Sequence, residues 1–306
     1  MKNEHLLVIR FSSLGEIALL VPVIHALAHQ YPSIRITVLS RPMAAPLFDM
    51  LASNVSFMAA DINKEYHGLR GLNALYRRLM AKHFTAVADL NSIFKSEYLR
   101  MRFNLDRYRV AHIKKRQSLR RRLIPYNNKV EPPSPLSMDA CTTVLARLGY
   151  PVEPSFHSLF PPERASLRTL PVPLNERKAF QQWIGVAPFD DNDEAESSRQ
   201  TLQSIIHSLV RRHPSCRILL FAHQKQQTPI LDEIAVLAPK QCINASKAAG
   251  GLRHELMLMN RLDVILTFNA TYRQLASLVD IPLLGPDDNT EAPDTITQKI
   301  EAILNP

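Results

Sequence analysis

The segment LLVIRFSSLGEIALLVPVIHALAHQYPSIRITVLSRP, residues 6–42, decides the fold. Its apolar run at residues 6–9 predicts a buried parallel strand, because strands covered on both faces read as continuous apolar runs. Residues 11–15 predict a turn, and apolar residues three and four apart predict a helix over residues 17–30. Alternation at residues 34–40 predicts a second strand. The order strand, helix, strand indicates a βαβ unit.

The same order recurs along the rest of the chain. Further strands are predicted at residues 55–59, 84–90, 183–187, 217–222, 241–244, 264–267 and 282–284. Further helices are predicted at residues 69–82, 138–148, 201–212, 230–237, 252–260, 272–278 and 295–304. This alternation predicts an α/β fold with doubly wound parallel sheets, whose ligands bind at the carboxyl ends of the strands.

Prolines divide the chain in two. Six of them fall within residues 151–173, a density typical of a linker. We therefore expect an N-terminal Rossmann-like domain at residues 1–160, a linker at 161–175 and a C-terminal Rossmann-like domain at 176–306. Two such domains predict a ligand cleft between them.

Composition narrows the class of protein. The chain has 306 residues, 46% apolar and 21% charged, which excludes a disordered or fibrous protein. Its 8 glycines form neither a G-x-G-x-x-G nor a P-loop motif. The three cysteines match neither a metal-site spacing nor a disulfide framework, which predicts a reduced, cytoplasmic setting and no metal site. No apolar stretch approaches the roughly 18 residues of a membrane span.

Positive charge is concentrated in the first half of the chain. Residues 1–150 carry 22 Lys and Arg against 10 Asp and Glu, whereas residues 151–306 carry 15 against 18. Arg100–Arg122 alone holds ten basic residues and one acid. This segment predicts a polyanionic partner such as lipid phosphates or a phosphorylated glycan, although a solvated basic face is an alternative. We expect no nucleic-acid partner, because no nucleic-acid-binding motif accompanies the charge.

The first turn carries a candidate catalytic carboxylate. Ser12, Ser13, Gly15 and Glu16 place two hydroxyls, a flexible glycine and a carboxylate where a buried strand enters a helix. A carboxylate there can act as a base. The alternative is a capping box, with Ser13 as N-cap and Glu16 three residues later.

The wider segment resembles the N-terminal motif of glycosyltransferase family 9, the ADP-heptose:lipopolysaccharide heptosyltransferases. That family usually reads I-R-x-S-x-x-G-D-x-x-x-x-x-P-x-x-x-x-L, and the residues in register are Ile9, Arg10, Ser12, Gly15, Pro22 and Leu27. The resemblance continues through residues 67–103 and through parts of the second half. It implies the GT-B architecture of two facing Rossmann domains, with no cofactor and no metal requirement.

The resemblance also implies an activity. Family members transfer a heptose, with inversion, from a nucleotide diphosphate sugar to a lipopolysaccharide core sugar. Glu16 stands where the family has its Asp, the implied base. The family's D-L-H motif resembles Asp89-Leu90-Asn91, and its Arg-Ser pair resembles Lys95-Ser96. The implied acceptor-side residues are therefore Ser12, Ser13, Gly15, Asp89, Asn91 and Lys95.

The donor half departs further from the family pattern. The loop after Pro188 holds five acids within residues 190–196, and Arg199 is the nearest cation that could replace the family's lysine. The family's D-[ST]-[GA]-x-x-H motif is replaced here by Asn269-Ala270-Thr271-Tyr272-Arg273-Gln274. The implied donor-side residues are Pro188, Arg199, Asn269, Ala270, Thr271, Gln274 and Gly285.

Two functions stay open at this point. The first is an inverting glycosyltransferase that uses an ADP-heptose-like donor and a lipopolysaccharide core acceptor, in the cytoplasm or peripheral at the inner membrane through Arg100–Arg122. The second is a degenerate family member that has lost donor chemistry and acts as a binding or regulatory protein in lipopolysaccharide assembly.

Overall fold

The computed structural model describes residues 4–49, 51–91, 93–113, 137–160, 165–189, 195–222, 224–285 and 293–304. The chain divides into two compact units, Met1–Phe156 and His157–Pro306. Residues 165–175, which the proline pattern places in a linker, belong to the second unit, and Leu167, Leu170 and Leu174 are buried there.

The first unit is a five-stranded parallel sheet in the order β3-β2-β1-β4-β5. Its strands are β1 (His5–Ile9), β2 (Arg35–Ser40), β3 (Val55–Ala59), β4 (Ala86–Asp89) and β5 (Arg109–His112). Its helices are α1 (Leu14–Ala18), α2 (Val21–Gln30), the 3-10 helix η1 (Pro42–Leu47), α3 (Gly68–Met80), α4 (Phe94–Leu105) and α5 (Met138–Arg147).

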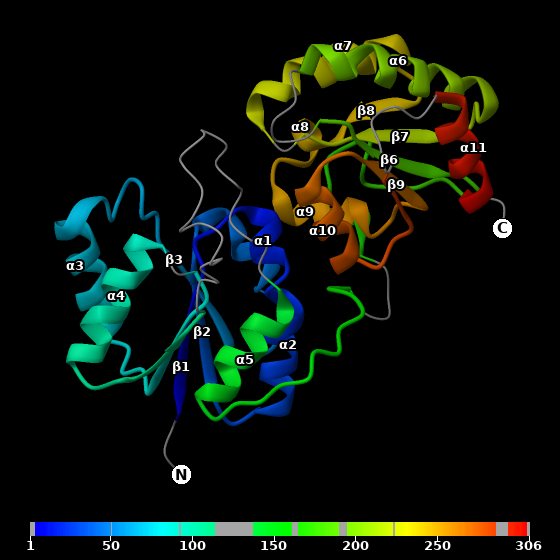
Figure 1. Ribbon diagram of the computed structural model, residues 1–306. Helices are drawn as coiled ribbons and strands as arrows, with labels where there is room; N and C mark the ends of the chain where they lie inside the picture. The colour runs from blue at the N-terminus through cyan, green and yellow to red at the C-terminus, as the bar shows by residue number, and fades with distance from the viewer. Residues whose placement is uncertain are drawn as a thin grey trace, which may run out of the picture. The chain divides into compact units, whose positions relative to one another are not determined.

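Helices cover both faces of the first sheet. Figure 1 shows α3 and α4 on one face and α2 and α5 on the other. Leu7 and Ile9 of β1 pack with Leu75 of α3 and with Leu99 and Phe103 of α4 in one apolar cluster. All five residues of β1 are buried, which accounts for the continuous apolar run in the sequence.

The first predicted helix is two helices. α1 ends at Ala18 and α2 begins at Val21, with Pro22 in its first turn. Proline has no N–H, and its ring clashes with the carbonyl four residues earlier, which here belongs to Ala18. Pro22 therefore ends the first helix and starts the second. The break leaves α1 as a short helix whose first turn carries Glu16.

The second unit is a five-stranded parallel sheet in the order β10-β9-β6-β7-β8. Its strands are β6 (Trp183–Ala187), β7 (Arg217–Leu220), β8 (Cys242–Asn244), β9 (Val264–Thr267) and β10 (Leu283–Leu284). Its helices are the 3-10 helices η3 (Leu167–Thr169) and η4 (Lys225–Gln227), with α6 (Ala195–Arg212), α7 (Thr228–Leu237), α8 (Ala245–Ala249), α9 (Leu252–Met259), α10 (Ala270–Leu278) and α11 (Pro293–Leu304).

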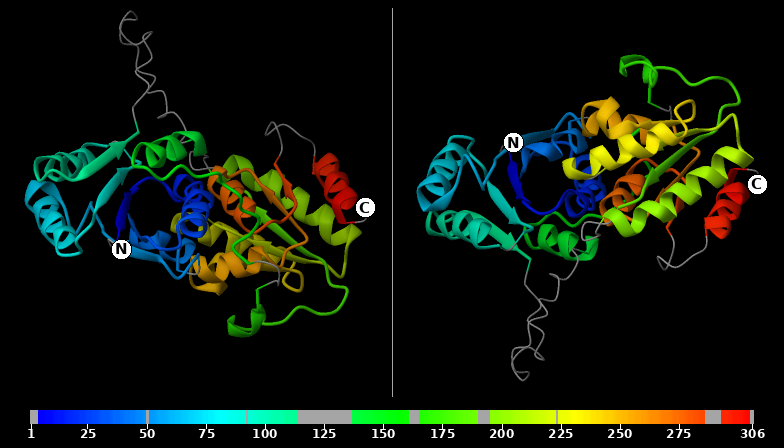
Figure 2. Two further views of the ribbon diagram at one scale, coloured as in Figure 1. Left: turned by 90° about the horizontal axis from the view of Figure 1, so that it is seen from below. Right: turned by 90° about the horizontal axis from the view of Figure 1, so that it is seen from above.

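The second sheet is also covered on both faces. Leu231 of α7 and Ile300 of α11 belong to the same apolar cluster as Leu209 of α6 and Ile218 of β7. α11, drawn in red, lies beside α6 in Figures 1 and 2. α8, α9 and α10 lie on the other face.

The two sheets have the same strand order when each is counted from its own first strand. The predicted doubly wound α/β fold is therefore confirmed in both units. In each sheet the first strand pairs with its second and its fourth strand, so the chain reverses its winding direction at β1/β4 and at β6/β9. Ligands bind outside the carboxyl ends of the strands at such a switch point.

Candidate functional site

The carboxyl end of β1 brings a buried cation to the candidate base. Arg10 follows β1, and its side chain is only 7% exposed. Arg10 Nη1 donates to the Leu90 carbonyl oxygen, and Arg10 Nη2 lies 3.1 Å from Glu16 Oε2. Burial lowers the pKa of Arg10, and the nearby Glu16 carboxylate opposes that shift. The pair orients a carboxylate at the β1/β4 switch point.

The helix cap and the ion pair use different parts of Glu16. Ser13 is the N-cap of α1, and its Oγ accepts from the Glu16 backbone N–H at 3.4 Å. The Glu16 carboxylate contacts Arg10 rather than closing the second half of a capping box. Capping therefore leaves the carboxylate, 29% exposed, available for chemistry.

Asp89 and Asn91 join the end of β4 to the turn after β1. Asn91 Oδ1 accepts from the Phe11 backbone N–H at 3.1 Å. Asp89 is fully buried, and its carboxylate accepts from the Asn91 backbone N–H at 3.0 Å and from Arg100 at 3.1 Å. Asp89 and Asn91 thus fix the backbone around the candidate base.

Three polar atoms at this edge are buried without a hydrogen-bond partner in the described part of the chain. They are Arg10 Nε, Ser12 Oγ and Asn91 Nδ2. Buried polar atoms are normally paired, so three unpaired ones at a switch point are candidates for contacts to a polar ligand such as a sugar.

Lys95 lies apart from this group. Its Nζ donates to the Ile62 carbonyl oxygen and to Asn63 Oδ1, in the turn after β3. The structure therefore brings Ser12, Ser13, Gly15, Glu16, Asp89 and Asn91 together around the ends of β1 and β4, and it gives the Lys95 ammonium a structural contact elsewhere.

In the second unit, Asn269 joins the ends of β6 and β9. It is fully buried and is the N-cap of α10, accepting from the Tyr272 backbone N–H at 3.0 Å. Its Nδ2 donates to the Phe189 carbonyl oxygen at 2.9 Å, and this bond holds the backbone directly after Pro188, which is buried. Asn269 therefore holds the start of α10 beside the end of β6, and this needs both its Oδ1 acceptor and its Nδ2 donor.

The start of α10 carries the other predicted donor-side residues. Ala270 is exposed, Thr271 is buried and Gln274 is half-buried. The exposed side chain of Arg273 lies against Gly285 at the end of β10, because a Cβ placed on Gly285 would be 2.9 Å from Arg273 Nη2. Helix N-termini bind anions, and this guanidinium adds a positive charge at the same edge.

Arg199 is the cation that the sequence predicts for the donor side. It lies on α6, where Arg199 Nη2 donates to the Glu233 carboxylate of α7. The acidic residues 190–194 lie outside the described part of the chain.

A further buried network supports the start of α10. The Tyr272 hydroxyl donates to Glu255 Oε2 at 2.9 Å and lies 3.2 Å from the Ala222 carbonyl oxygen. Burial raises the pKa of Glu255 above its usual value, and the hydrogen bond from Tyr272 opposes the shift. Sequence inspection missed this network, because its members come from separate elements and share no motif.

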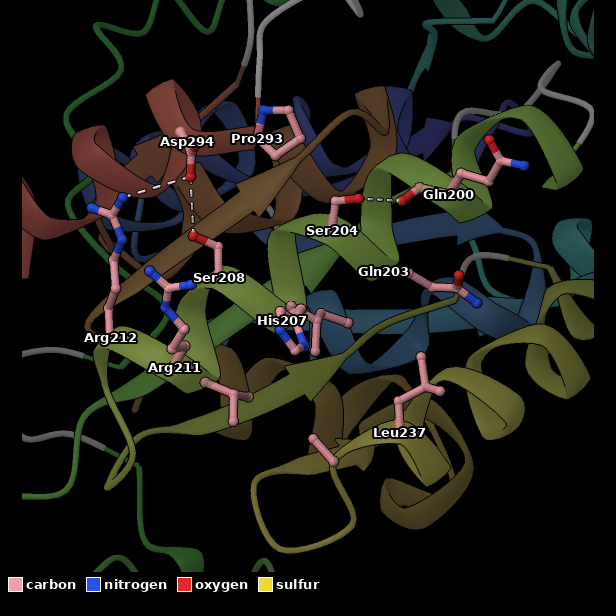
Figure 3. A pocket seen from close by; sticks show the side chains of 13 residues that line it. Gln200, Gln203, Ser204, His207, Ser208, Arg211, Arg212, Leu237, Pro293 and Asp294 are labelled. Carbon is pink, nitrogen blue, oxygen red and sulfur yellow. Dashed lines mark hydrogen bonds and ion pairs between the residues drawn. The ribbon is translucent and has the colours of Figure 1, made fainter.

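The hollow shown in Figure 3 is a different feature. It measures about 830 Å³ and lies over α6, the end of α7 and the start of α11. Ser208 and Arg212 of α6 contact Asp294 at 3.4 and 3.6 Å. None of its lining residues follows a strand of the sheet, so it is separate from the switch point.

The residues that the structure describes hold neither a membrane span nor a metal-binding cluster. None of the described helices combines the length and apolar character needed to cross a membrane. The same residues contain no group of three or more His, Cys, Asp or Glu side chains that could hold a metal ion.

Comparison with known proteins supports the fold. No protein-family model matches the sequence, and no curated protein matches it either. Among solved structures, Escherichia coli heptosyltransferase WaaC with ADP-2-deoxy-2-fluoro heptose has a TM-score of 0.69 at 14% identity, over 97% of this chain and 99% of that one. Escherichia coli ADP-heptose lps heptosyltransferase II has a TM-score of 0.64 at 15% identity, over 98% of each chain.

A second class of enzyme shares the architecture. UDP-GlcNAc 2-epimerase from Methanocaldococcus jannaschii has a TM-score of 0.54 at 14% identity, over 99% of this chain and 93% of that one. The chain therefore has the two-domain GT-B fold of the heptosyltransferases, as the sequence resemblance predicts. Because one fold carries several chemistries, the residues of the site decide the function.

Proposed function

We propose that this chain is a divergent member of glycosyltransferase family 9 and an inverting glycosyltransferase. It transfers a heptose or a related sugar from a nucleotide diphosphate sugar to a hydroxyl of a lipopolysaccharide core. The observation that carries the proposal is the Glu16 carboxylate, which Arg10 Nη2 holds at 3.1 Å beside the β1/β4 switch point. An inverting transfer needs one base at the acceptor hydroxyl.

In this reaction Glu16 takes the proton of the acceptor hydroxyl. The acceptor oxygen forms a bond to the anomeric carbon, and the bond from that carbon to the diphosphate oxygen breaks. The electron pair leaves with the nucleoside diphosphate. Arg10 is a positioning residue, because its buried guanidinium limits the directions that the carboxylate can take.

The donor is assigned to the second unit. Backbone N–H groups at the start of α10 and the Arg273 guanidinium offer hydrogen bonds and positive charge to a diphosphate. The solved heptosyltransferase WaaC structures with ADP and with ADP-2-deoxy-2-fluoro heptose support a nucleotide of this class as the donor. We favour transfer over a binding-only role because the candidate base and the start of α10 each lie at a switch point.

The basic segment Arg100–Arg122 is assigned to the anionic acceptor and the membrane surface. Residues 114–122 lie outside the described part of the chain. Within the described part, Arg100 contacts the buried Asp89 and Arg102 donates to Asn73 Oδ1, so these two guanidinium groups also have structural contacts.

The test is transfer itself. Purified protein is incubated with ADP-heptose and heptose-free lipopolysaccharide core, and ADP release and acceptor mass are measured. We expect ADP release matched by a heptose mass increase, and both to be about 100-fold or more slower with Glu16→Gln. Ser137→Ala is the control, because it removes a helix cap of the same kind from α5 without touching the site. Folded protein that releases no ADP with this acceptor contradicts the proposal.

A further inference from the structure

Helix α4 presents a stripe of large apolar side chains to solvent. Phe94 and Leu105 are each 70% exposed, and Met101 is 48% exposed. Residues 7 and 11 positions apart return to within about 20° of one another around an α-helix, so the three side chains share one face over roughly 16 Å. We call these three residues the α4 stripe.

The opposite face of α4 explains why the stripe points outward. Leu99 and Phe103 are fully buried in the cluster formed with α3 and the sheet. Tyr76 of α3 stacks edge-on against Phe103, and Arg102 donates to Asn73 of α3. α4 is therefore anchored by its inner face, and the α4 stripe makes no contribution to the core. Exposed apolar side chains gathered on one face mark an interaction surface.

The surroundings of the stripe are basic. Residues 68–107, which span α3, β4 and α4, contain eight Lys and Arg and three Asp and Glu. One of the acids, Asp89, is buried against Arg100, and Asp106 accepts from the Tyr76 hydroxyl. The third acid, Glu97 of α4, is half-buried. Arg70 and Arg77 of α3 are exposed, and they lie three and four residues from Asn73, the residue of α3 that contacts Arg102 of α4. An apolar stripe with exposed cations on the neighbouring helix suits the surface of an anionic bilayer, where apolar side chains enter the interface and cations meet lipid phosphates.

The stripe also lies next to the candidate site. It begins at Phe94, three residues after Asn91, whose side chain holds the turn after β1. We infer that the α4 stripe, with Arg70 and Arg77, is a docking surface for anionic phospholipid. It holds the first unit against the membrane with the end of β1 near a lipid-anchored acceptor. The docking surface is inferred from the exposed residues alone, whereas its role in bringing the site to an acceptor rests on the proposed function.

Vesicle binding tests the surface without any sugar. Sedimentation is measured with phosphatidylcholine vesicles that contain about one third phosphatidylglycerol, and with pure phosphatidylcholine. We expect the Phe94→Ser/Leu105→Ser variant to lose roughly tenfold or more in partitioning onto the anionic vesicles. Val236→Ser/Leu237→Ser is the matched control, because both residues are exposed on α7 of the less basic unit, and it should bind like wild type. Circular dichroism confirms that each variant is folded.

Two further arms separate charge from insertion. Arg70→Glu/Arg77→Glu should also weaken binding, and its deficit relative to wild type should shrink as salt is raised. Phe94→Trp should emit at shorter wavelength on anionic vesicles and be quenched by brominated lipid, whereas the existing Trp183 is fully buried.

Wild-type binding by Phe94→Ser/Leu105→Ser overturns the inference, as does an unquenched Trp at position 94. A lipid-free dimer that Phe94→Ser/Leu105→Ser dissociates also overturns it. Vesicle binding without sugar transfer leaves the docking surface standing and removes the proposed function.

Discussion

Arg10 Nη2 donates to Glu16 Oε2 at 3.1 Å, so a residue at the end of β1 orients the carboxylate in the first turn of α1. The two side chains differ in burial, at 7% and 29% exposed. The guanidinium is fixed inside the fold by the Leu90 carbonyl oxygen, whereas the carboxylate keeps a solvent-facing side. This combination allows one carboxylate to be both held in place and reachable by an acceptor hydroxyl.

Replacing the carboxylate without changing its size tests its role as base. Glu16→Gln keeps an acceptor for Arg10 and leaves the backbone cap from Ser13 intact. We expect kcat to fall by about 100-fold or more, because general-base catalysis is lost. Donor affinity by calorimetry should stay within about twofold, and unfolding free energy by urea titration within about 1 kcal/mol. Parallel losses of activity and stability would instead assign Glu16 to capping.

Removing the buried guanidinium should affect stability as well as activity. Arg10→Met deprives the Leu90 carbonyl oxygen and the Glu16 carboxylate of their donor. We expect a loss of about 2 kcal/mol in the free energy of unfolding, because removing one partner leaves buried groups unsatisfied. Arg70→Met, at an exposed position of α3, should change stability by no more than about 0.5 kcal/mol. If the two variants lose the same unfolding free energy in urea titrations, the buried contacts of Arg10 do not stabilise the fold.

Asn269 should not tolerate the aspartate that its motif has in the family. Asn269→Asp keeps the acceptor for the Tyr272 N–H but loses the donor to the Phe189 carbonyl oxygen. One buried carboxylate oxygen then faces the Phe189 carbonyl oxygen, and two acceptors repel each other, so we expect a destabilisation of about 1–3 kcal/mol in thermal or urea unfolding. Asn104→Asp, at an exposed position of α4, provides the control. A more stable Asn269→Asp protein would contradict the hydrogen bond to Phe189.

Glu255 gives the second unit a pH dependence of defined sign. Burial raises its pKa above the usual value of 4.5, so the folded state holds this proton more tightly than the unfolded state does. The contribution of Glu255 to stability is therefore present below about pH 4.5 and is lost as pH rises through the folded pKa. We expect the unfolding free energy of wild type to decline relative to that of Glu255→Gln as pH is raised from 4 towards neutrality. Parallel pH profiles for the two proteins would contradict the assignment.

The architecture could be predicted because the central strands are buried on both faces. β1 and β6 are continuous apolar runs, and the predicted strands at residues 6–9 and 183–187 match them within one residue. Periodicity alone did not predict α4 and β5. The α4 stripe places apolar residues on the solvent side of a helix whose other face is also apolar, which obscures the helical pattern. β5 has four residues, with Arg109 and His112 at its ends, and forms one edge of its sheet.

The candidate site could be predicted only where neighbours in sequence are neighbours in space. Ser13 and Glu16 share one turn, and their relation to the helix start could be predicted from spacing. Arg10 is part of the quoted motif, yet its contact with Leu90 depends on the pairing of β1 with β4. Arg199 is a predicted donor-side cation, and its ion pair with Glu233 depends on the packing of α6 against α7. Arg273 lies against Gly285 because α10 and β10 are adjacent in the fold.

Isothermal titration with ADP and ADP-heptose tests the central claim most directly. We predict that both ligands bind with a dissociation constant below about 1 mM, because the KM values of enzymes usually lie between about 1 μM and 1 mM. Arg273→Glu should weaken this binding about tenfold or more, because it reverses the charge beside the start of α10. Glu16→Gln should bind like wild type. If the folded protein binds neither ADP nor ADP-heptose at millimolar concentration, the central claim is contradicted.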